Sequence, residues 1–216
     1  PVKGADFWVY HAVSPTIHPS LALILHNFFT RMETTKAEKM IDYHVAIRGA
    51  LFDIAQVCDS ADEIALNARF IEDGLLFIRD GYIQARMTWQ EGEQHLDAQK
   101  GYTDRRGKLL LPGFIDAHVH YPQTEMIGAF GEQLLEWLTT YTFPVESQFA
   151  DEAYADEIAR FFIEQLLSHG TTTAMVFCTL HPASVNALFS EALRLNMRLI
   201  AGKVMMDRHA PEYLSE

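Results

Sequence analysis

The chain has 216 residues, of which 49% are hydrophobic and 21% are charged, and its formal net charge is −12. This composition supplies a hydrophobic core and argues against a wholly disordered protein. The basic residues are few and scattered, so they form no basic patch that would hold a nucleic acid or an anionic membrane surface. The longest apolar run also falls far short of the roughly 20 residues that cross a bilayer. We therefore expect neither a nucleic-acid partner nor a membrane partner.

The sequence contains two cysteines, Cys58 and Cys178, and no Cys-x-x-Cys pair. This usage excludes a disulfide framework and the usual structural zinc patterns. A reducing, cytoplasmic setting is therefore expected. We interpret both cysteines as small apolar side chains of the core.

Residues 1–43 are interpreted as an N-terminal extension that is disordered or not native to the protein. The chain opens with Pro1, and Met32 and Met40 are alternative starts. The apolar run at 21–29 lacks the basic region and the small-residue cleavage site of a signal peptide. We assign no function to this segment.

Residues 44–112 predict a small β-rich module, of the β-sandwich kind. Short apolar runs dominate it, and Asp80-Gly81 between two such runs is a strong signal for a β-hairpin. The polar stretch 90–106 is expected to form loops and edge strands. Pro112-Gly113 then marks a boundary in the chain.

Residues 113–216 predict strands that alternate with helices. Asp151 is a good N-cap, Gly170 is placed to end a helix, and Pro182 suits the first turn of the next one. The predicted strands are 114–120, 171–177 and 198–206, and the predicted helices are 131–140, 152–168 and 182–196. This alternation is typical of a parallel α/β sheet or barrel. Because three parallel strands cannot close an eight-stranded barrel, the chain is expected to be a fragment.

His118 and His120 stand at the end of the first strand of this region. Side chains alternate faces along a strand, so both imidazoles and Asp116 are expected on one face. Neutral imidazole is a preferred ligand of zinc and related ions. Two histidines on an exposed strand face are the alternative for a bare His-x-His. The Pro-Gly before the strand and the polar segment after it favour the metal site, since catalytic groups of α/β barrels cluster where strands end.

This arrangement resembles the amidohydrolase superfamily, and within it the guanine deaminases. The small β module followed by Pro-Gly-Phe-Ile-Asp-Ala-His-Val-His carries the first resemblance. The second rests on Tyr-Pro-Gln and on Leu-Leu-Glu-Trp-Leu-Thr-Thr-Tyr-Thr-Phe-Pro-Val-Glu, with two later motifs. These segments are residues 112–123, 132–146, 170–174 and 202–208. The resemblance covers about residues 44–216 and implies the first three strands of a (β/α)8 TIM-type barrel.

The resemblance implies zinc-dependent hydrolysis of guanine to xanthine and ammonia, with iron as the alternative metal. His118 and His120 would be the first two metal ligands, and Gln123 would hydrogen-bond the purine. A zinc-polarised water would attack the purine C2. The remaining ligand histidines, the metal aspartate and the proton-shuttling glutamate have no position in this chain and are expected beyond Glu216. No catalytic residue is therefore assigned within it, and the fragment alone is expected to be inactive. A homodimer is expected from related enzymes.

Other candidate residues receive weaker interpretations. Asp116 is expected to orient a ligand rather than to bind the metal. For Trp137 and Tyr141 two roles stay open, ordinary packing and stacking on a purine. The acids near the site are read as solvated or structural carboxylates; these are Glu125, Glu132 and Glu136. The remaining histidines show no ligand spacing and are read as surface or core residues; these are His11, His18, His26, His44, His95, His169, His181 and His209.

Alternative functions stay open. Another purine-, pyrimidine- or triazine-directed deaminase or chlorohydrolase would share the His-x-His motif but should lack the segment from Trp137 to Pro144. A non-catalytic barrel paralogue is the alternative from a different class. The cytidine-deaminase arrangement is excluded, because the sequence has neither His-x-Glu nor Pro-Cys-x-x-Cys.

Overall fold

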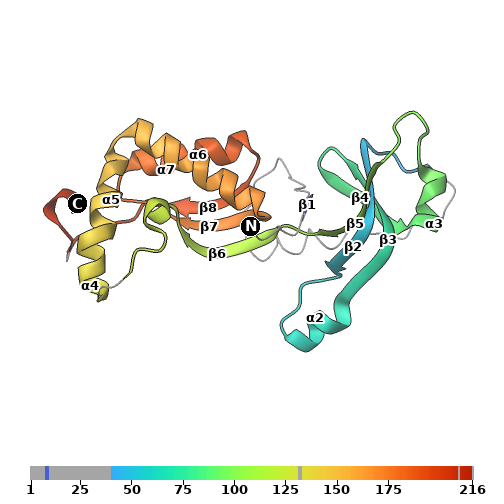
Figure 1. Ribbon diagram of the computed structural model, residues 1–216, viewed down its shortest axis with the longest axis horizontal. Helices are drawn as coiled ribbons and strands as arrows, with labels where there is room; N and C mark the ends of the chain where they lie inside the picture. The colour runs from blue at the N-terminus through green and yellow to red at the C-terminus, as the bar shows by residue number, and fades with distance from the viewer. Residues whose placement is uncertain (1–7, 10–39, 131–132, 209, 216) are drawn as a thin grey trace. The chain divides into compact units, whose positions relative to one another are not determined.

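The computed structural model describes residues 8–9, 40–130, 133–208 and 210–215 (Figure 1). The chain divides into two compact units, which meet between Pro112 and Gly113. Most of the extension expected at residues 1–43 lies outside the described residues. Tyr43 is an exception, because its side chain is only 1% exposed and its ring packs edge-on against Phe77 at 5.1 Å. The packed module therefore begins before residue 44.

The first unit contains one mixed five-stranded sheet with the strand order β1-β5-β2-β3-β4. Its strands are β1 Trp8–Val9, β2 Val45–Ile54, β3 Ala68–Arg79, β4 Tyr82–Thr88 and β5 Thr103–Leu111. β3 pairs antiparallel with β2 and β4, whereas β5 pairs parallel with β1 and β2. The expected β-rich module is therefore present. The described residues supply one sheet layer, where a sandwich needs two.

The predicted hairpin is confirmed at the turn between β3 and β4. Asp80 and Gly81 have φ angles of 51° and 80°, so both turn residues adopt the left-handed conformation of a type I′ turn. Its twist matches that of the strands, and Arg79 pairs with Tyr82 directly beside the turn. In the described part of this unit the sheet is accompanied by the short helices α2 Ala61–Asn67 and α3 Trp89–Gly92 and the 3₁₀ turn η1 Glu93–His95.

Both faces of this sheet carry apolar side chains. Ala46 and Phe77 are paired across β2 and β3 and belong to one cluster, which Trp89 helps to cover. Ile47 and Leu76 are the next pair and belong to a second cluster. Neighbouring residues of a strand point to opposite faces, so the two clusters lie on opposite sides of the sheet.

The second unit is an α/β structure around a parallel three-stranded sheet, with the order β6-β7-β8. Its main elements are β6 Phe114–His120, α6 Glu152–Ser168, β7 Thr171–Phe177, α7 Pro182–Arg194 and β8 Arg198–Gly202. Figure 1 shows α6 and α7 together over one face of this sheet. The predictions for β6, α6 and β7 are confirmed with the same bounds, including the N-cap at Asp151. The predicted third strand ends earlier, at Gly202.

Between β6 and α6 the chain forms a series of short helical elements. They are the 3₁₀ helix η2 Tyr121–Met126, α4 Leu134–Trp137, the π-helix η3 Leu138–Thr142, α5 Phe143–Ser147 and the 3₁₀ turn η4 Gln148–Ala150. The predicted helix at 131–140 is thus wrong in both bounds. The helix begins at Leu134, and helical structure continues past residue 140. Pro144 has no N–H to donate to Thr140, and Phe143 donates instead to the carbonyl five residues back, at Leu138. The π turn accommodates the proline inside the helix. A last 3₁₀ turn, η5 Glu212–Leu214, follows β8.

The core of the second unit fixes the end of β6. Tyr121 follows the strand directly and is fully buried among Phe149, Phe162 and their neighbours. Its hydroxyl donates a 2.6 Å hydrogen bond to the carbonyl of Ser184 on α7. The burial and hydrogen bond of Tyr121 therefore hold the residues on either side of it in place. No helix in the described part of the chain has the length and apolar character to cross a membrane.

Candidate metal centre

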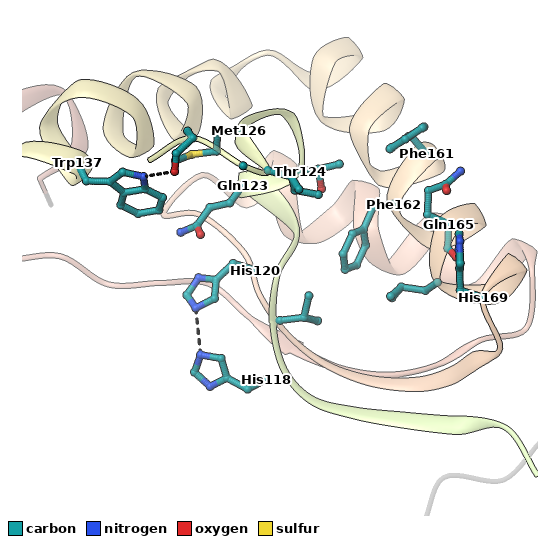
Figure 2. A pocket seen from close by; sticks show the side chains of 15 residues that line it. His118, His120, Gln123, Thr124, Met126, Trp137, Phe161, Phe162, Gln165 and His169 are labelled. Atoms are coloured by element: carbon teal, nitrogen blue, oxygen red, sulfur yellow. Dashed lines mark hydrogen bonds between the residues drawn. The ribbon is translucent and has the colours of Figure 1, made fainter. Parts of the chain in front are cut away.

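His118 and His120 bring their ring nitrogens together at the carboxyl end of β6. Figure 2 shows both rings on the same side of the strand, facing each other. Their Nε2 atoms are 3.2 Å apart. The two imidazoles thus converge as their spacing predicts.

The strand is irregular between Asp116 and Val119, an interval that includes His118. The pairing of β6 with β7 shifts register between Asp116 and Val119, so strict alternation is interrupted and does not relate Asp116 to the histidines. Instead, the Asp116 carboxylate accepts a 3.0 Å hydrogen bond from the backbone N–H of His118. Asp116 therefore acts on the backbone that carries His118, and no contact of its carboxylate with either ring is seen among the described residues.

Phe177 supports the two rings, although the sequence analysis did not single it out. It ends β7 directly opposite His120 in the parallel pairing. Its ring stacks on that of His120 at 4.7 Å with an interplanar angle of 12°, and lies 4.8 Å from that of His118. Only the register between β6 and β7 reveals this neighbour, because the residues are far apart in the sequence.

The donor geometry fits a metal ion. Nitrogens that each lie about 2.1 Å from a tetrahedral zinc ion are about 3.4 Å apart, close to the separation of these Nε2 atoms. Burial, and then the neighbouring His118, lower the pKa of His120, which favours the neutral imidazole that binds metals. Within the described residues, no group of three or more His, Cys, Asp or Glu side chains is placed to hold a metal. Among the described residues the two histidines therefore stand as a pair of candidate ligands.

A pocket of about 550 Å³ adjoins the histidines. Gln123 and Trp137 line it together with His118 and His120, and Figure 2 shows Gln123 between Trp137 and His120. The Trp137 indole N–H donates a 3.0 Å hydrogen bond to the carbonyl of Ala129, which fixes the ring. Tyr141 is not among the lining residues. The structure thus brings Gln123 and Trp137 to the candidate metal centre.

Glu146 is a buried carboxyl group on α5, which packs against η2, the element that carries Gln123. Its side chain is only 8% exposed. Burial raises the pKa of Glu146, and a side-chain hydrogen bond with Gln123 opposes that rise. The sequence offered one signal for Glu146, namely a carboxyl group in a segment that packs inward.

The remaining candidates within the described residues show no ligand arrangement. Glu125 accepts a 2.5 Å hydrogen bond from the hydroxyl of Tyr154, which explains it as a structural carboxylate. Glu136 is exposed, and Glu132 lies outside the described residues. His169 lines the pocket from the C-cap of α6, but its Nδ1 is 2.8 Å from the carbonyl of Gln165. The histidines His11, His18, His26 and His209 lie outside the described residues.

Comparison with known proteins identifies the class of this fold and site. A model described as the amidohydrolase family matches residues 109–216, half of the chain. The chain belongs to this family.

Its relatives include guanine deaminases. The guanine deaminase of Escherichia coli K12 is 54% identical over 169 residues, which are 78% of this chain and 38% of that protein. The solved structure of the E. coli enzyme superposes with a TM-score of 0.77 at 53% identity, over 80% of this chain and 40% of that one. Guanine deaminase from C. acetobutylicum, solved with guanine in its active site, gives a TM-score of 0.65 at 28% identity over 80% of this chain and 39% of that one. The chain thus spans about two fifths of the length of these relatives.

Proposed function

We propose that the protein containing this chain is a zinc-dependent guanine deaminase, which hydrolyses guanine to xanthine and ammonia. The observation that carries the proposal is the convergence of the His118 and His120 Nε2 atoms, 3.2 Å apart, beside a pocket that Gln123 lines. The similarity to guanine deaminases across both units supports guanine as the substrate. Another deaminase, a chlorohydrolase or a non-catalytic paralogue is less well supported, because the closer similarity lies with guanine deaminases.

The fold proposed for the whole protein is a (β/α)8 barrel, of which β6, β7 and β8 are the first three strands. Helices α6 and α7 cover one face of this sheet (Figure 1). Large apolar side chains from all three strands remain exposed, namely Ile115, Met175 and Ile200. The inward face of barrel strands forms a packed core, so further strands would bury such residues. We likewise propose that the first unit, residues 44–112 with Tyr43, is one layer of a small β-sandwich, since its sheet is apolar on both faces.

In this proposal His118 and His120 hold the metal through Nε2, and Phe177 keeps their rings in place by stacking. When bound, zinc supplies Lewis-acid chemistry that makes water a nucleophile near neutral pH. Gln123 hydrogen-bonds the purine, and Trp137 forms a wall of the pocket. The other metal ligands and the proton-transferring groups are assigned to residues outside this chain. Iron is the alternative metal.

The proposal also includes a cytoplasmic location and a homodimer. Both cysteines are free thiols, as expected in a reducing compartment. Gel filtration of the purified protein tests the dimer separately from the activity.

The decisive experiment is turnover of guanine by the purified whole protein. We expect release of ammonia, formation of xanthine and about one zinc ion per chain. Removal of the metal with a chelator should abolish turnover, and added zinc should restore it. Turnover of adenine, cytosine or a chlorotriazine with none of guanine would show that the substrate is wrong. No turnover of any of them by the zinc-loaded protein would favour the non-catalytic paralogue.

A further inference from the structure

A network of buried polar groups connects the carboxyl ends of β6 and β7 with the first turn of α7. The hydroxyl of Tyr121, the residue after β6, donates a 2.6 Å hydrogen bond to the carbonyl of Ser184 on α7. The hydroxyl of Thr179, two residues after β7, donates a 2.9 Å hydrogen bond to Oγ of Ser184. Tyr121, Thr179 and Ser184 are all fully buried. Burial of such groups is tolerated only when they are hydrogen-bonded, as they are here.

The hydrogen bonds around Ser184 form a closed ring. The backbone N–H of His181 donates to Oγ1 of Thr179 at 3.1 Å, and the Ser184 hydroxyl donates to the carbonyl of His181 at 2.8 Å. The backbone N–H of Thr179 also donates to Oγ of Ser184 at 3.1 Å. A buried network in which every hydroxyl has its partners specifies one arrangement of the chain. The turn from β7 into α7 is therefore a firm anchor for the Tyr121 hydroxyl.

Tyr121 stands between two residues of the proposed centre. It directly follows His120, the candidate ligand, and it is the first residue of η2, which carries Gln123. Its carbonyl accepts a 2.6 Å hydrogen bond from the hydroxyl of Thr124, the residue after Gln123. The backbone from His120 to Thr124 is thus tied to Tyr121 at both ends.

We propose that Tyr121 is a positioning residue: its hydroxyl, anchored on the carbonyl of Ser184, sets where His120 meets the metal and where Gln123 meets the purine. This inference rests on the proposed function. Tyr121 is not among the described residues that line the pocket, so its effect passes through the backbone on either side of it.

The hydroxyl of Tyr121 has a purpose that packing alone does not explain. The ring fills the core between Phe149 and Phe162, with ring centroids 5.1 and 5.6 Å away. A phenylalanine would fill the same space and would need no polar partner in this buried place. The hydroxyl therefore adds a fixed link between the end of β6 and α7, and that link fixes position rather than volume.

The test compares the whole protein with its Tyr121→Phe variant. This substitution removes only the hydroxyl, and the carbonyl of Ser184 keeps the N–H donor that α7 itself supplies. Zinc affinity, measured by competition with a chelator, should fall about tenfold, as it does when contacts that orient a metal ligand are lost. In the zinc-saturated variant the KM for guanine should also rise, because Gln123 moves with the same segment.

Tyr43→Phe is the matched control. Tyr43 is a tyrosine of the first unit that is 1% exposed, and its hydroxyl accepts a 2.8 Å hydrogen bond from the backbone N–H of Asp97. Loss of a buried, hydrogen-bonded hydroxyl should lower the Tm of both variants. Only Tyr121→Phe should weaken zinc binding and raise the KM, and this difference separates positioning from stability.

A double-mutant cycle isolates the contribution that passes through Gln123. In the Gln123→Ala background, Tyr121→Phe should raise the KM little further, since the side chain that it positions is gone. It should still weaken zinc binding there, because His120 is unchanged.

A second pair of variants tests the anchor where Tyr121→Phe is too unstable to purify. Thr179→Val keeps the shape of the side chain but removes the hydroxyl that donates to Ser184, so it should weaken zinc binding in the same direction. Thr179→Ser keeps a hydroxyl at this position and should retain zinc affinity closer to that of the wild type.

An unchanged zinc affinity or an unchanged KM in Tyr121→Phe overturns the positioning role, and turnover of guanine by the wild type then leaves the proposed function intact. An equal loss of zinc affinity in Tyr43→Phe also overturns it, since the effect would then be one of general stability. A wild-type protein that neither binds zinc nor turns over guanine overturns the proposed function and the positioning role together.

Discussion

At the scale of single residues, the candidate centre depends on how His118 and His120 are held. Phe177 stacks on the His120 ring, and the Asp116 carboxylate accepts the backbone N–H of His118. These contacts hold the Nε2 atoms at a separation that suits one metal ion. Holding ligands in place before the metal arrives lowers the entropic cost of binding. In the proposed metal site, the remaining ligands are assigned to residues outside those described.

We expect the double substitution of His118 and His120 by alanine to remove the metal from the whole protein. Imidazole nitrogens are strong zinc ligands, and the remaining ligands alone cannot complete a tetrahedral site. Metal content per chain after dialysis, measured by atomic emission, should fall from about one zinc to almost none. His169→Ala is the control, because His169 lines the same pocket just after α6 and its replacement should leave the metal in place. Unchanged metal content in the double variant would contradict the assignment of the ligands.

At the scale of the elements, a close approach to β7 fixes the position of β6 along the sheet. A Cβ on Gly113 would lie 1.9 Å from Oγ1 and 2.5 Å from Cγ2 of Thr172, a residue that is 7% exposed. The backbone N–H of Phe114 also donates a 2.8 Å hydrogen bond to the carbonyl of Gly170. The glycine of the Pro-Gly motif thus allows the two strands to meet where β6 begins, and β6 then carries the histidines to its far end.

Gly113→Ala should therefore destabilise the second unit. The added methyl group collides with a buried side chain that cannot move away freely, and such overpacking costs about 1–3 kcal/mol. We expect a lower Tm in thermal unfolding. Gly202→Ala on β8 is the matched control, since a Cβ there meets no atom within 4 Å and its Tm should be unchanged. Equal Tm values for both variants would show that the strands can separate without cost.

At the scale of the whole molecule, carboxylates paired with arginines occur in both units and tie its stability to pH. Arg194 forms a two-pronged pair with Glu191 on α7, at 2.6 and 2.8 Å, and lowers the pKa of that carboxyl. Arg106 lowers the pKa of Asp104 to about 2. A carboxyl whose pKa is lowered by folding stabilises the fold above its unfolded-state pKa and loses that effect as pH falls through its folded-state pKa. Lowering the pH should therefore reduce the stability of the folded protein, because it protonates these paired carboxylates.

The Tm should accordingly fall as the pH is lowered from about 4 to about 2, the interval between the ordinary pKa of an acidic side chain and that of Asp104 in the fold. Arg194→Gln should reduce this fall more than Arg106→Gln does. The carboxylate beside Arg194, Glu191, is only 9% exposed, whereas the solvent screens the pair of Asp104 and Arg106. Calorimetry across this pH range measures how steeply the Tm of each variant falls with pH. A Tm that rises toward pH 2 would contradict the sign of the effect.

Local patterns in the sequence predicted much of the fold. The hairpin turn at Asp80-Gly81 follows from the left-handed conformations that these residue types tolerate, and α6 follows from its cap and its apolar period. The error at residues 131–140 arose because Pro144 was not treated as part of a helix, and a π turn accommodates it there. Such an insertion depends on packing and leaves no period of its own in the sequence.

The sequence by itself predicted that the histidine rings would share one face, from the alternation of side chains along a strand. The structure places both rings on one side of β6 although the strand is irregular between Asp116 and Val119. Its Pro-Gly, Tyr-Pro-Gln and Trp-to-Pro motifs also indicated the family. Only the tertiary structure decided which residues lie around the rings: Phe177 across the strand pairing, and Gln123 and Trp137 at the pocket. These neighbours depend on the register of β6 with β7 and on how the helical elements after β6 pack. Both are set by packing between segments that are distant in the chain, and local residue patterns carry no record of it.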